Sequence, residues 1–204
     1  MKKFELTTEF ITNAFGKKLF RIKALVEFGN VKAGELGGYV EKEGNISQDG
    51  NAWVYGNAWV SGNAWVSGNA WVCGNAWVYD NAWVYDNAKV YGNAKAYGDA
   101  KAYGDARVSG NAWVCGDARV SGNAKVYGNA DYALVQGFGT EFRCTTFYRG
   151  KNKKIMVNCG CFHGDLEGFR KQVKETRSGK IAKEYLMIAD LMENHFASED
   201  SGNE

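Results

Sequence analysis

The residues with the greatest potential for recognition chemistry stand in two columns of a six-residue repeat. Thirteen consecutive hexads, from Gly50 to Tyr127, follow the pattern Gly-Asn-Ala-x-Val-x with few departures. The first variable position is Trp in seven hexads, Lys in four and Arg in two, and the second is Tyr, Ser or Cys. Aromatic rings can stack on bases, and cations can contact phosphates or lie over rings. We therefore expect whatever this protein recognises to contact these two columns.

The repeat also indicates which side chains lie inside. The segment Ala-x-Val-x predicts a short strand, in which alternate residues point to opposite faces. A column that exchanges Trp for Lys cannot lie in a close-packed interior, where small changes of volume are already costly. The Ala and Val columns are therefore predicted to point inward and the two variable columns outward. The Gly-Asn or Gly-Asp pairs, which tolerate positive φ, are predicted to form the corners.

A strict six-residue period is typical of a β-solenoid. The hexads resemble the hexapeptide-repeat, left-handed β-helix family, whose motif runs aliphatic, x, Gly or Asp, Asn or Asp, small, x, as in Val54-Tyr55-Gly56-Asn57-Ala58-Trp59. This resemblance implies a left-handed helix of triangular cross-section. A short strand, a tight corner and a small interior favour three hexads per coil, with coils rising by roughly 4.7–4.9 Å. The predicted fold class is an all-β solenoid flanked by a β-hairpin N-terminal cap and a small α+β C-terminal unit.

The flanking sequences set the predicted domain limits. Residues 1–43 are expected to form the hairpin cap, from strands at Phe4–Ile11 and Lys18–Leu25. Such a cap covers the open end of a solenoid. The repeats, with degenerate turns at both ends, are predicted to occupy residues 44–133.

Residues 134–198 are predicted to form the α+β unit, and the tail 199–204 to be disordered. Strands are expected at Phe142–Tyr148 and Lys154–Asn158, joined by a basic turn. Asp165 is a candidate N-cap for a first helix, and a second is expected over roughly Ile181–Phe196. The apolar stripe of the second helix is predicted to contain Tyr185, Ile188, Leu191 and Met192. The whole layout, including the segment Cys159-Gly160-Cys161-Phe162, resembles uncharacterised phage and prophage proteins of low-GC bacteria, a family that implies no activity.

With three hexads per coil, residues 18 apart share a face of the solenoid. Face one carries Trp53, Trp71, Lys89, Arg107 and Lys125; face two carries Trp59, Trp77, Lys95 and Trp113; and face three carries Trp65, Trp83, Lys101 and Arg119. The outward surface therefore divides into an indole belt and a Lys/Tyr belt. The candidate binding residues are Trp53, Trp59, Trp65, Trp71, Trp77 and Trp83 in the first, and Lys89, Tyr91, Lys95, Tyr97, Lys101 and Tyr103 in the second.

Two interpretations of this surface stay open. In the first, the outward rings stack on their neighbours one coil away, and the cations are ordinary solubilising residues. In the second the belts bind, because six indoles around a short prism exceed the apolar surface that monomers usually leave in water. A folded-back terminal segment, another protomer or a partner would then cover part of it. Since hexapeptide-repeat proteins are commonly trimers, the resemblance favours a homotrimer. A small nucleotide signal or a host (defence) protein is the other expected ligand of this phage-type binding protein.

Catalysis is the alternative from another class, because many proteins of the resembled family are acyl- or acetyltransferases. Those enzymes use a His general base beside the coils, often with a loop that interrupts the repeat. The hexads here contain no His, and nothing interrupts Gly50–Tyr127. We therefore predict no enzyme activity, no catalytic residue and no cofactor, with a purely structural assembly scaffold as a further alternative.

The C-terminal cysteines are also considered as a metal site. Its possible ligands are Cys144, Cys159, Cys161 and His163. Cys and His are suitable zinc ligands, but Cys-x-Cys-x-His is not a zinc-ribbon spacing. Alternation along an extended segment would place the last three on one face. A pair of half-buried cysteines closing a small core is the favoured interpretation, so no metal is predicted.

Composition narrows the compartment and the partners. A net charge of +2 gives no general argument for nucleic acid, and no sequence-specific nucleic-acid binding is expected. Five cysteines, an odd set, indicate reduced thiols in a reducing cytosol. The sequence carries no signal peptide and no apolar run long enough to span a bilayer. A cytoplasmic protein is therefore expected, in the host cytosol if it is phage-encoded.

Overall fold

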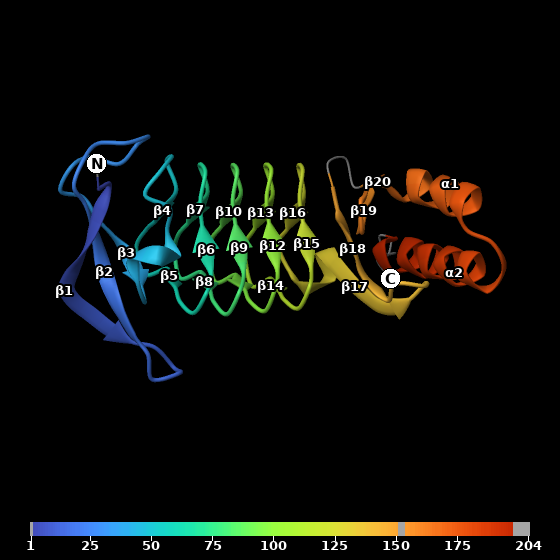
Figure 1. Cartoon of the computed structure of the whole chain (residues 1–204), viewed down its shortest axis with the longest axis horizontal. Coiled ribbons are helices and arrows are strands. Elements are labelled where there is room, and N and C mark those ends of the chain that lie inside the picture. Colours follow the sequence, from blue (N-terminus) through green and yellow to red (C-terminus); the bar gives the residue numbers. More distant parts are fainter. Residues whose placement is uncertain (1, 151–153, 198–204) are drawn as a thin grey trace, which may run out of the picture. The chain divides into compact units, whose positions relative to one another are not determined.

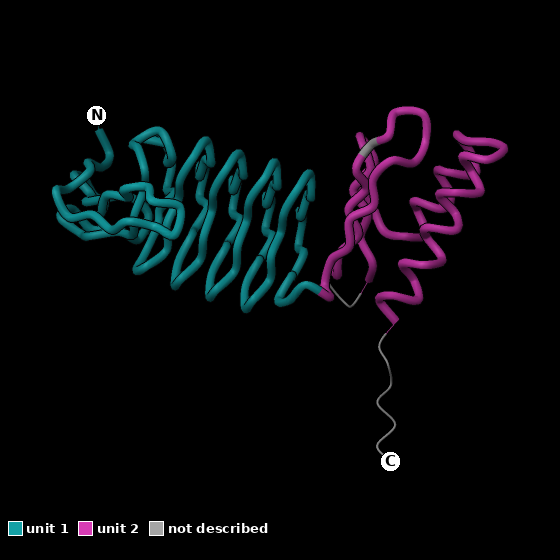
Figure 2. Tube along the Cα trace, turned by 90° about the horizontal axis from the view of Figure 1, so that it is seen from below, with its two compact units in different colours: residues 1–129 teal, residues 130–204 magenta. Residues whose placement is uncertain are grey.

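The structure is a computed structural model of the chain, and it describes residues 2–150 and 154–197. The chain divides into two compact units, Met1–Asn129 and Ala130–Glu204 (Figure 2). The predicted tail, 199–204, and the centre of the predicted basic turn, 151–153, lie outside the described residues. The domain limits drawn from the sequence stay predictions.

The first unit begins with three strands, β1 (Phe4–Thr12), β2 (Lys18–Ala24) and β3 (Leu36–Val40). The first two pair antiparallel, which confirms the predicted hairpin, and β3 pairs antiparallel with β2. On its other edge β3 runs parallel to the first strand of face two, with Tyr39 opposite Trp59. The hairpin therefore continues the sheet of face two rather than standing apart from it. A short 3-10 helix, η1 (Glu43–Asn45), leads from β3 toward the first coil.

The hexads form the predicted solenoid, in which each hexad contributes one two-residue strand (Figure 1). Face one contains β4 (Trp53–Val54), β7 (Trp71–Val72), β10 (Lys89–Val90), β13 (Arg107–Val108) and β16 (Lys125–Val126). Face two contains β5 (Trp59–Val60), β8 (Trp77–Val78), β11 (Lys95–Ala96) and β14 (Trp113–Val114). Face three contains β6 (Trp65–Val66), β9 (Trp83–Val84), β12 (Lys101–Ala102) and β15 (Arg119–Val120). Each strand pairs in parallel with the strand 18 residues away, as Trp71 does with Lys89, so three hexads per coil is confirmed.

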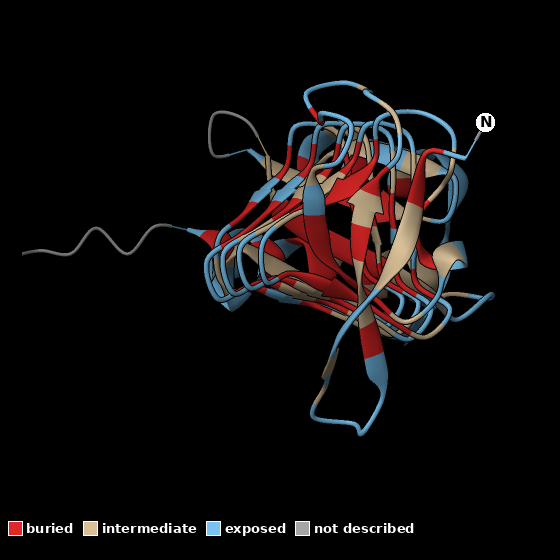
Figure 3. Cartoon of the chain, turned by 90° about the vertical axis from the view of Figure 1, so that its left-hand side faces the viewer, coloured by how far each residue is buried: buried red, intermediate tan, exposed pale blue. Residues whose placement is uncertain are grey.

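The interior of the solenoid consists of the Ala and Val columns, as predicted. Every member of both columns from Ala52 to Val126 is buried, and these positions account for much of the red inside the coils in Figure 3. Backbone amides donate to carbonyls one coil further on, as Trp71 N does to Ala88 O at 3.0 Å. Small aliphatic side chains thus fill a narrow interior, while the stacked backbones saturate each other's hydrogen bonds.

The corners use the conformation that the Gly-Asn pair was predicted to supply. The corner glycines from Gly50 to Gly122 have φ of about +60° to +71°. Asp80 and Asp86 hold the same position at φ of 59° and 58°, a region that side chains rarely adopt. Their carboxylates accept hydrogen bonds from the amides of Gly98, at 3.4 Å, and Gly104, at 3.1 Å, one coil away. These bonds help to offset the conformational cost of replacing Gly there.

Lys3 is a buried cation where the N-terminal strands meet the first coil. Its Nζ donates to Ala52 O at 3.0 Å and to Gly50 O at 3.3 Å, and it lies 4.8 Å from the centroid of the Phe28 ring. Burial lowers the pKa of Lys3 to about 8, although the nearby Asp49 carboxylate acts in the opposite direction. The carbonyls and the ring retain the cation, but removal from water still disfavours the charged form.

This lowered pKa predicts a pH dependence of stability. Between about pH 8 and the ordinary Lys pKa of 10.5, the unfolded chain retains the Lys3 proton and the folded chain does not. The contribution of Lys3 to the free energy of unfolding should therefore rise with pH across that range. Urea unfolding of the wild type and of Lys3→Met should show the difference, wild type minus variant, increasing from pH 8 to pH 10.5. A difference that stays flat or falls would contradict the prediction.

The second unit is a four-stranded antiparallel sheet with two helices. Its strands, in sheet order, are β17 (Tyr132–Phe138), β18 (Arg143–Arg149), β19 (Ile155–Cys159) and β20 (Phe162–Asp165). The 3-10 helix η2 (Asn129–Asp131) precedes them, and α1 (Leu166–Thr176) and α2 (Gly179–Phe196) follow. The core lies between the helices and the sheet and includes Phe147, Phe169 and Met192. None of the described helices could cross a membrane.

Several predictions for this unit are confirmed, one is wrong and one strand was not predicted. Asp165 is the N-cap of α1, since its Oδ1 accepts from Gly168 N at 2.9 Å. Leu191, however, is 60% exposed, and Ala189 takes its place on the buried stripe of α2. From Tyr185 the positions i+3, i+4 and i+7 share a helix face, whereas i+6 points away. Strand β17 was not predicted: its first two residues were assigned to degenerate repeats, and no element was assigned to residues 134–138.

Candidate functional site

The three N-terminal strands and the β2–β3 loop cover two of the indoles predicted to form the outward surface. Trp53 is 0% exposed, with the rings of Phe4 and Phe28 edge-on to it at centroid distances of 5.9 and 5.3 Å. Trp59 is 5% exposed and packs with Leu19 and Tyr39. Both indoles point out of the coils as predicted, but including them among the candidate binding residues is wrong. A folded-back terminal segment, one of the covers expected from the sequence, occupies their faces.

On face two the remaining outward residues contact one another. The Nζ of Lys95 lies between two indoles, 4.0 Å from the Trp77 centroid and 4.5 Å from that of Trp113. Tyr79 stacks on Tyr97 with centroids 5.0 Å apart and an interplanar angle of 6°. Hydrogen bonding with the Cys115 thiol, together with burial, raises the pKa of Tyr97 to about 12. The ring-stacking interpretation describes this face well.

Face one has a shallow hollow beyond the covered Trp53. It has a volume of about 260 Å³ and is lined by Trp71, Cys73, Lys89, Tyr91 and Arg107. Lys89 Nζ lies 4.8 Å from the Trp71 centroid, and the Tyr55 ring also contacts that indole, with centroids 5.5 Å apart. Burial raises the pKa of the Cys73 thiol and so lowers its thiolate fraction.

Face three keeps its indoles in contact with solvent. Trp65 and Trp83 are 43% and 42% exposed, with centroids 5.9 Å apart and ring planes at 64°. Lys101 Nζ lies 4.6 Å from the Trp83 centroid, and beside it Tyr85 and Tyr103 stack at 5.0 Å. No part of the N-terminal hairpin that the structure describes makes a ring contact with either indole of this face.

A groove of about 500 Å³ lies beside Trp83, and we refer to it as the face-three groove. It is lined by Asn63, Asn81, Trp83, Asp99, Lys101, Asp117 and Arg119. The corner residues form a ladder along it, in which Asn63 Nδ2 donates to Asn81 Oδ1 at 3.2 Å and Asn81 Nδ2 donates to Asp99 Oδ1 at 3.0 Å. The groove therefore combines one indole, a row of amide and carboxylate groups, and two cations.

The corner residues of this groove were missed as candidates by sequence reasoning. The prediction considered only the two variable columns and treated the corners as turns. A signal was nevertheless present, because Asp99 and Asp117 replace Asn at corners 18 residues apart and so share one edge of face three. Their carboxylates balance Lys101 and Arg119, which gives the groove mixed charge rather than the positive charge expected of the Lys/Tyr belt.

The lysines of the predicted Lys/Tyr belt lie mainly over indoles. Lys89, Lys95 and Lys101 each contact the Trp one coil toward the N-terminus, at 4.0–4.8 Å from its centroid. Such cation–π contacts contribute about 0.5–1 kcal/mol at exposed sites. The indole belt and the Lys/Tyr belt predicted from the sequence are therefore in contact and form one surface. At the N-terminal end of the solenoid, face three has the most exposed indoles on this surface.

The C-terminal Cys/His residues do not converge as a metal site would require. The chain reverses at Gly160 and Cys161, so Cys159 pairs with Phe162 in a hairpin and the expected extended segment is wrong. Cys159 and Phe162 face the helices, and His163 lies on the opposite side, where its Nδ1 is 2.5 Å from Asn158 Oδ1. Cys144 lies on β18. Among the described residues no three His, Cys, Asp or Glu side chains gather as metal ligands.

A comparison with known protein families agrees with the solenoid seen in the structure. Residues 52–68, 58–74 and 102–116 match the family model described as the YdcK Beta solenoid repeat. These stretches lie wholly within the repeats, so they characterise the solenoid and not the flanking elements. The chain is thus a β-solenoid repeat protein. A search of curated proteins returns no match to it.

Proposed function

We propose that this chain is a non-enzymatic binding protein that recognises a protein partner through face three. The supporting observation is the exposure of two adjacent indoles, Trp65 and Trp83, on a solenoid whose other N-terminal indoles are buried or only partly exposed. Trp, Tyr and Arg supply most of the binding energy at protein interfaces. All three occur on this face, in Trp83, Tyr85 and Arg119, on a four-stranded parallel sheet.

The charge pattern favours a protein partner over a nucleotide. The face-three groove contains the carboxylates of Asp99 and Asp117 as well as the cations of Lys101 and Arg119. A phosphate group bound to the cations would lie close to the carboxylates, which disfavours it electrostatically. A protein surface can present a donor to each carboxylate and an acceptor to each cation, and a polar rim around aromatic residues is the usual anatomy of an interface.

Truncation of the two exposed indoles should strongly weaken partner binding. In a pull-down from host lysate we expect Trp65→Ala/Trp83→Ala to weaken capture by about 30-fold or more, since a central interface aromatic contributes about 2 kcal/mol or more. Trp113→Ala is the matched control, because Trp113 has the same repeat position and is 45% exposed but lies on face two. Loss of the same captured protein with Trp113→Ala, or its retention with the double variant, would exclude face three as the recognition surface.

Sequestration of a small nucleotide is the second candidate. It is favoured by one observation, that the face-three groove combines an indole for stacking with two cations in a volume suited to a small ligand. Tryptophan emission should then change on titration with cyclic or linear nucleotides, and the change should disappear in Trp83→Ala. An unchanged emission across the panel would leave the protein partner as the proposal.

Self-association is a further form of the same proposal, with the second copy as the partner. The trimer implied by the resemblance to hexapeptide-repeat proteins would bury the exposed indoles between protomers, and a purely structural scaffold would need no other ligand. Sedimentation velocity at micromolar concentration should then show trimers that dissociate in Trp65→Ala/Trp83→Ala. Monomers in the wild type would exclude this form.

We propose no enzymatic activity for the chain. An acyl- or acetyltransferase of this fold would need a base beside the coils, whereas His163 and His195 are both in the second unit and all corners from Gly50 to Tyr127 are tight turns. Acyl-CoA hydrolysis that is lost in His163→Ala or His195→Ala would contradict this. A reducing cytosol is the compartment we propose, that of a host cell if the protein is of the phage or prophage type that its layout resembles.

A further inference from the structure

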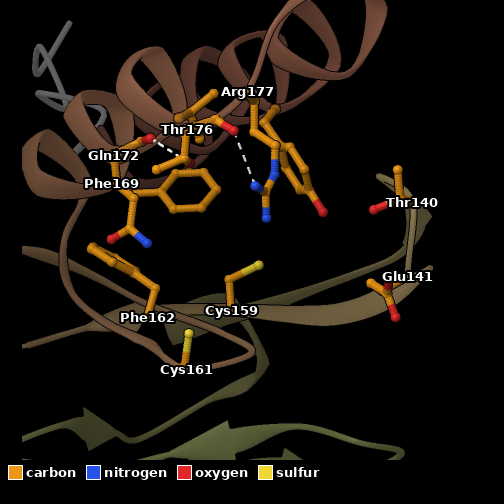
Figure 4. Close-up of a pocket in the computed structure, with 11 residues that line it drawn as sticks. Thr140, Glu141, Cys159, Cys161, Phe162, Phe169, Gln172, Thr176 and Arg177 are labelled. Atoms are coloured by element: carbon orange, nitrogen blue, oxygen red, sulfur yellow. Dashed lines mark hydrogen bonds between the residues drawn. The ribbon is translucent and has the colours of Figure 1, made fainter.

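Two cysteine thiols line one cavity of the second unit. Cys159 ends β19 and Cys161 lies in the following turn, and both line a cavity of about 70 Å³ beneath the two helices. Figure 4 shows both sulfur atoms pointing from the hairpin toward the helices. Cys159 is half-buried and its Sγ accepts a hydrogen bond from the Thr145 hydroxyl at 3.1 Å, whereas Cys161 is exposed. One thiol is therefore accessible from solvent and the other lies behind it.

The turn brings these two residues close enough for a covalent bond. Gly160 has a φ of +61°, in the left-handed region that favours glycine, and it reverses the chain between the two cysteines. Residues two apart are separated by at most roughly 7 Å between Cα atoms, even in an extended chain. A reversal shortens that separation into the range of about 4.4–6.8 Å that disulfides require. A side chain at residue 160 would oppose this turn.

The cavity is also lined by groups of both charges, which suit a small reagent that itself carries both charges. Arg177, at the end of α1, lines it, and its Nη1 donates to Thr176 O at 3.1 Å (Figure 4). Glu141 contributes the opposite charge from the β17–β18 loop, and the amide of Gln172 and the hydroxyl of Thr140 are neutral hydrogen-bonding groups. A small thiol compound that carries both amino and carboxylate groups, such as glutathione, matches this mixture.

We propose that Cys159 and Cys161 form a reversible dithiol site that is oxidised to an intramolecular disulfide by low-molecular-weight disulfides. The ring spans only three residues and so stores strain, and strained, exposed disulfides are the more easily reduced ones. The site is therefore reduced in a reducing cytosol and oxidised when the disulfide fraction of the thiol pool rises. This inference is independent of face three and of its partner.

The reaction proceeds by two exchanges. The Cys161 thiolate attacks one sulfur of glutathione disulfide, forming a mixed disulfide as the glutathione S–S bond breaks, and the glutathione thiolate released takes the proton lost by Cys161. The Cys159 thiolate then attacks the Cys161 sulfur, the bond to glutathione breaks, and the second glutathione takes the Cys159 proton. The protein loses two electrons and two protons, and the glutathione disulfide gains them.

Peptide mapping of the full chain tests this directly. The protein is treated with glutathione disulfide, alkylated and digested with trypsin, which releases Cys159 and Cys161 together in the peptide Ile155–Arg170 and Cys144 in the peptide Cys144–Arg149. We expect the first peptide to lose both alkylation sites and two hydrogens, to carry no glutathione, and to recover both sites after dithiothreitol. A glutathione adduct that persists on the wild-type peptide Ile155–Arg170 would overturn the proposal. So would alkylation of both cysteines in that peptide under conditions in which glutathione disulfide oxidises an added small dithiol, the positive control.

Two single variants assign the roles of the thiols. Cys159→Ser should retain one glutathionyl group on Cys161, because the resolving thiol is gone. Cys161→Ser should react more slowly, because only the half-buried thiol remains. Equal trapping in both variants would contradict the order of attack. The Cys144 peptide in the same digests should behave alike in all three proteins, and far-ultraviolet circular dichroism confirms that each variant is folded.

Discussion

Trp53→Ala is expected to lower the free energy of unfolding of the first unit by about 3–5 kcal/mol, the usual cost of removing a buried Trp side chain. The indole is fully buried between the rings of Phe4 and Phe28, and it fixes the N-terminal strands to the first coil. Its loss leaves a cavity that the rigid coil beneath it cannot fill. Urea unfolding followed by circular dichroism, which does not depend on Trp emission, should report the change.

The repeat supplies an unusually close control for this prediction. Trp113→Ala removes the same side chain from the same position of another hexad, but that indole is 45% exposed. We expect a loss of about 1 kcal/mol or less, mainly from its contact with Lys95. Similar losses for the two variants would show that the N-terminal strands do not bury Trp53 in solution.

The contrast between these two Trp residues also shows what the sequence could predict. The inward Ala and Val columns, the outward variable columns and the pairing of residues 18 apart follow from a period and from steric limits that act within each coil. The residues of each hexad are therefore sufficient to predict which columns point inward and which point outward. Because thirteen hexads carry the same pattern, a departure at one position does not change this prediction.

The covering of Trp53 and Trp59 could not be predicted in the same way. These residues stand in hexads almost identical to that of Trp65, and they differ only in whether a distant segment lies above them. Covering depends on the course of the β1–β2 hairpin and on the pairing of β3 with β5. The residues that determine that course, such as Phe4 and Phe28, carry no repeat pattern.

The face-three groove could be predicted from the sequence only in part. Its Asp99 and Asp117 stand at fixed positions of the repeat, so the 18-residue spacing alone places them on the edge that Lys101 and Arg119 share. The groove can be predicted from the sequence if the corner residues are treated as part of the surface as well as turns. Its ligand cannot be predicted from the sequence, because the outward columns are free of the packing constraints that determine the interior. This freedom is what allows one rigid scaffold to present indoles, cations and carboxylates in any order along its axis.

Gly38→Ala is expected to destabilise the first unit by about 3 kcal/mol or more, at the upper end of the cost of overpacking. A Cβ at residue 38 would lie 2.5 Å from Ala58 O and 2.6 Å from Val54 Cγ1. Ala58 O accepts the hydrogen bond from Tyr39 N at 3.0 Å that joins β3 to the solenoid. A backbone carbonyl in a stacked coil cannot move aside, so β3 must withdraw and loosen the cover over Trp53.

Gly44→Ala is the control for this substitution, because a Cβ at residue 44 would meet no atom within 4 Å. A change in an open surface position should lie within about 0.5 kcal/mol of the wild type. Hydrogen exchange offers a second measurement: in Gly38→Ala the amides of Tyr39 and Glu41, which donate to Ala58 O and Val60 O, should exchange faster, while those of the later coils keep their protection. Unchanged protection at these two amides would mean that β3 does not hold the hairpin to face two.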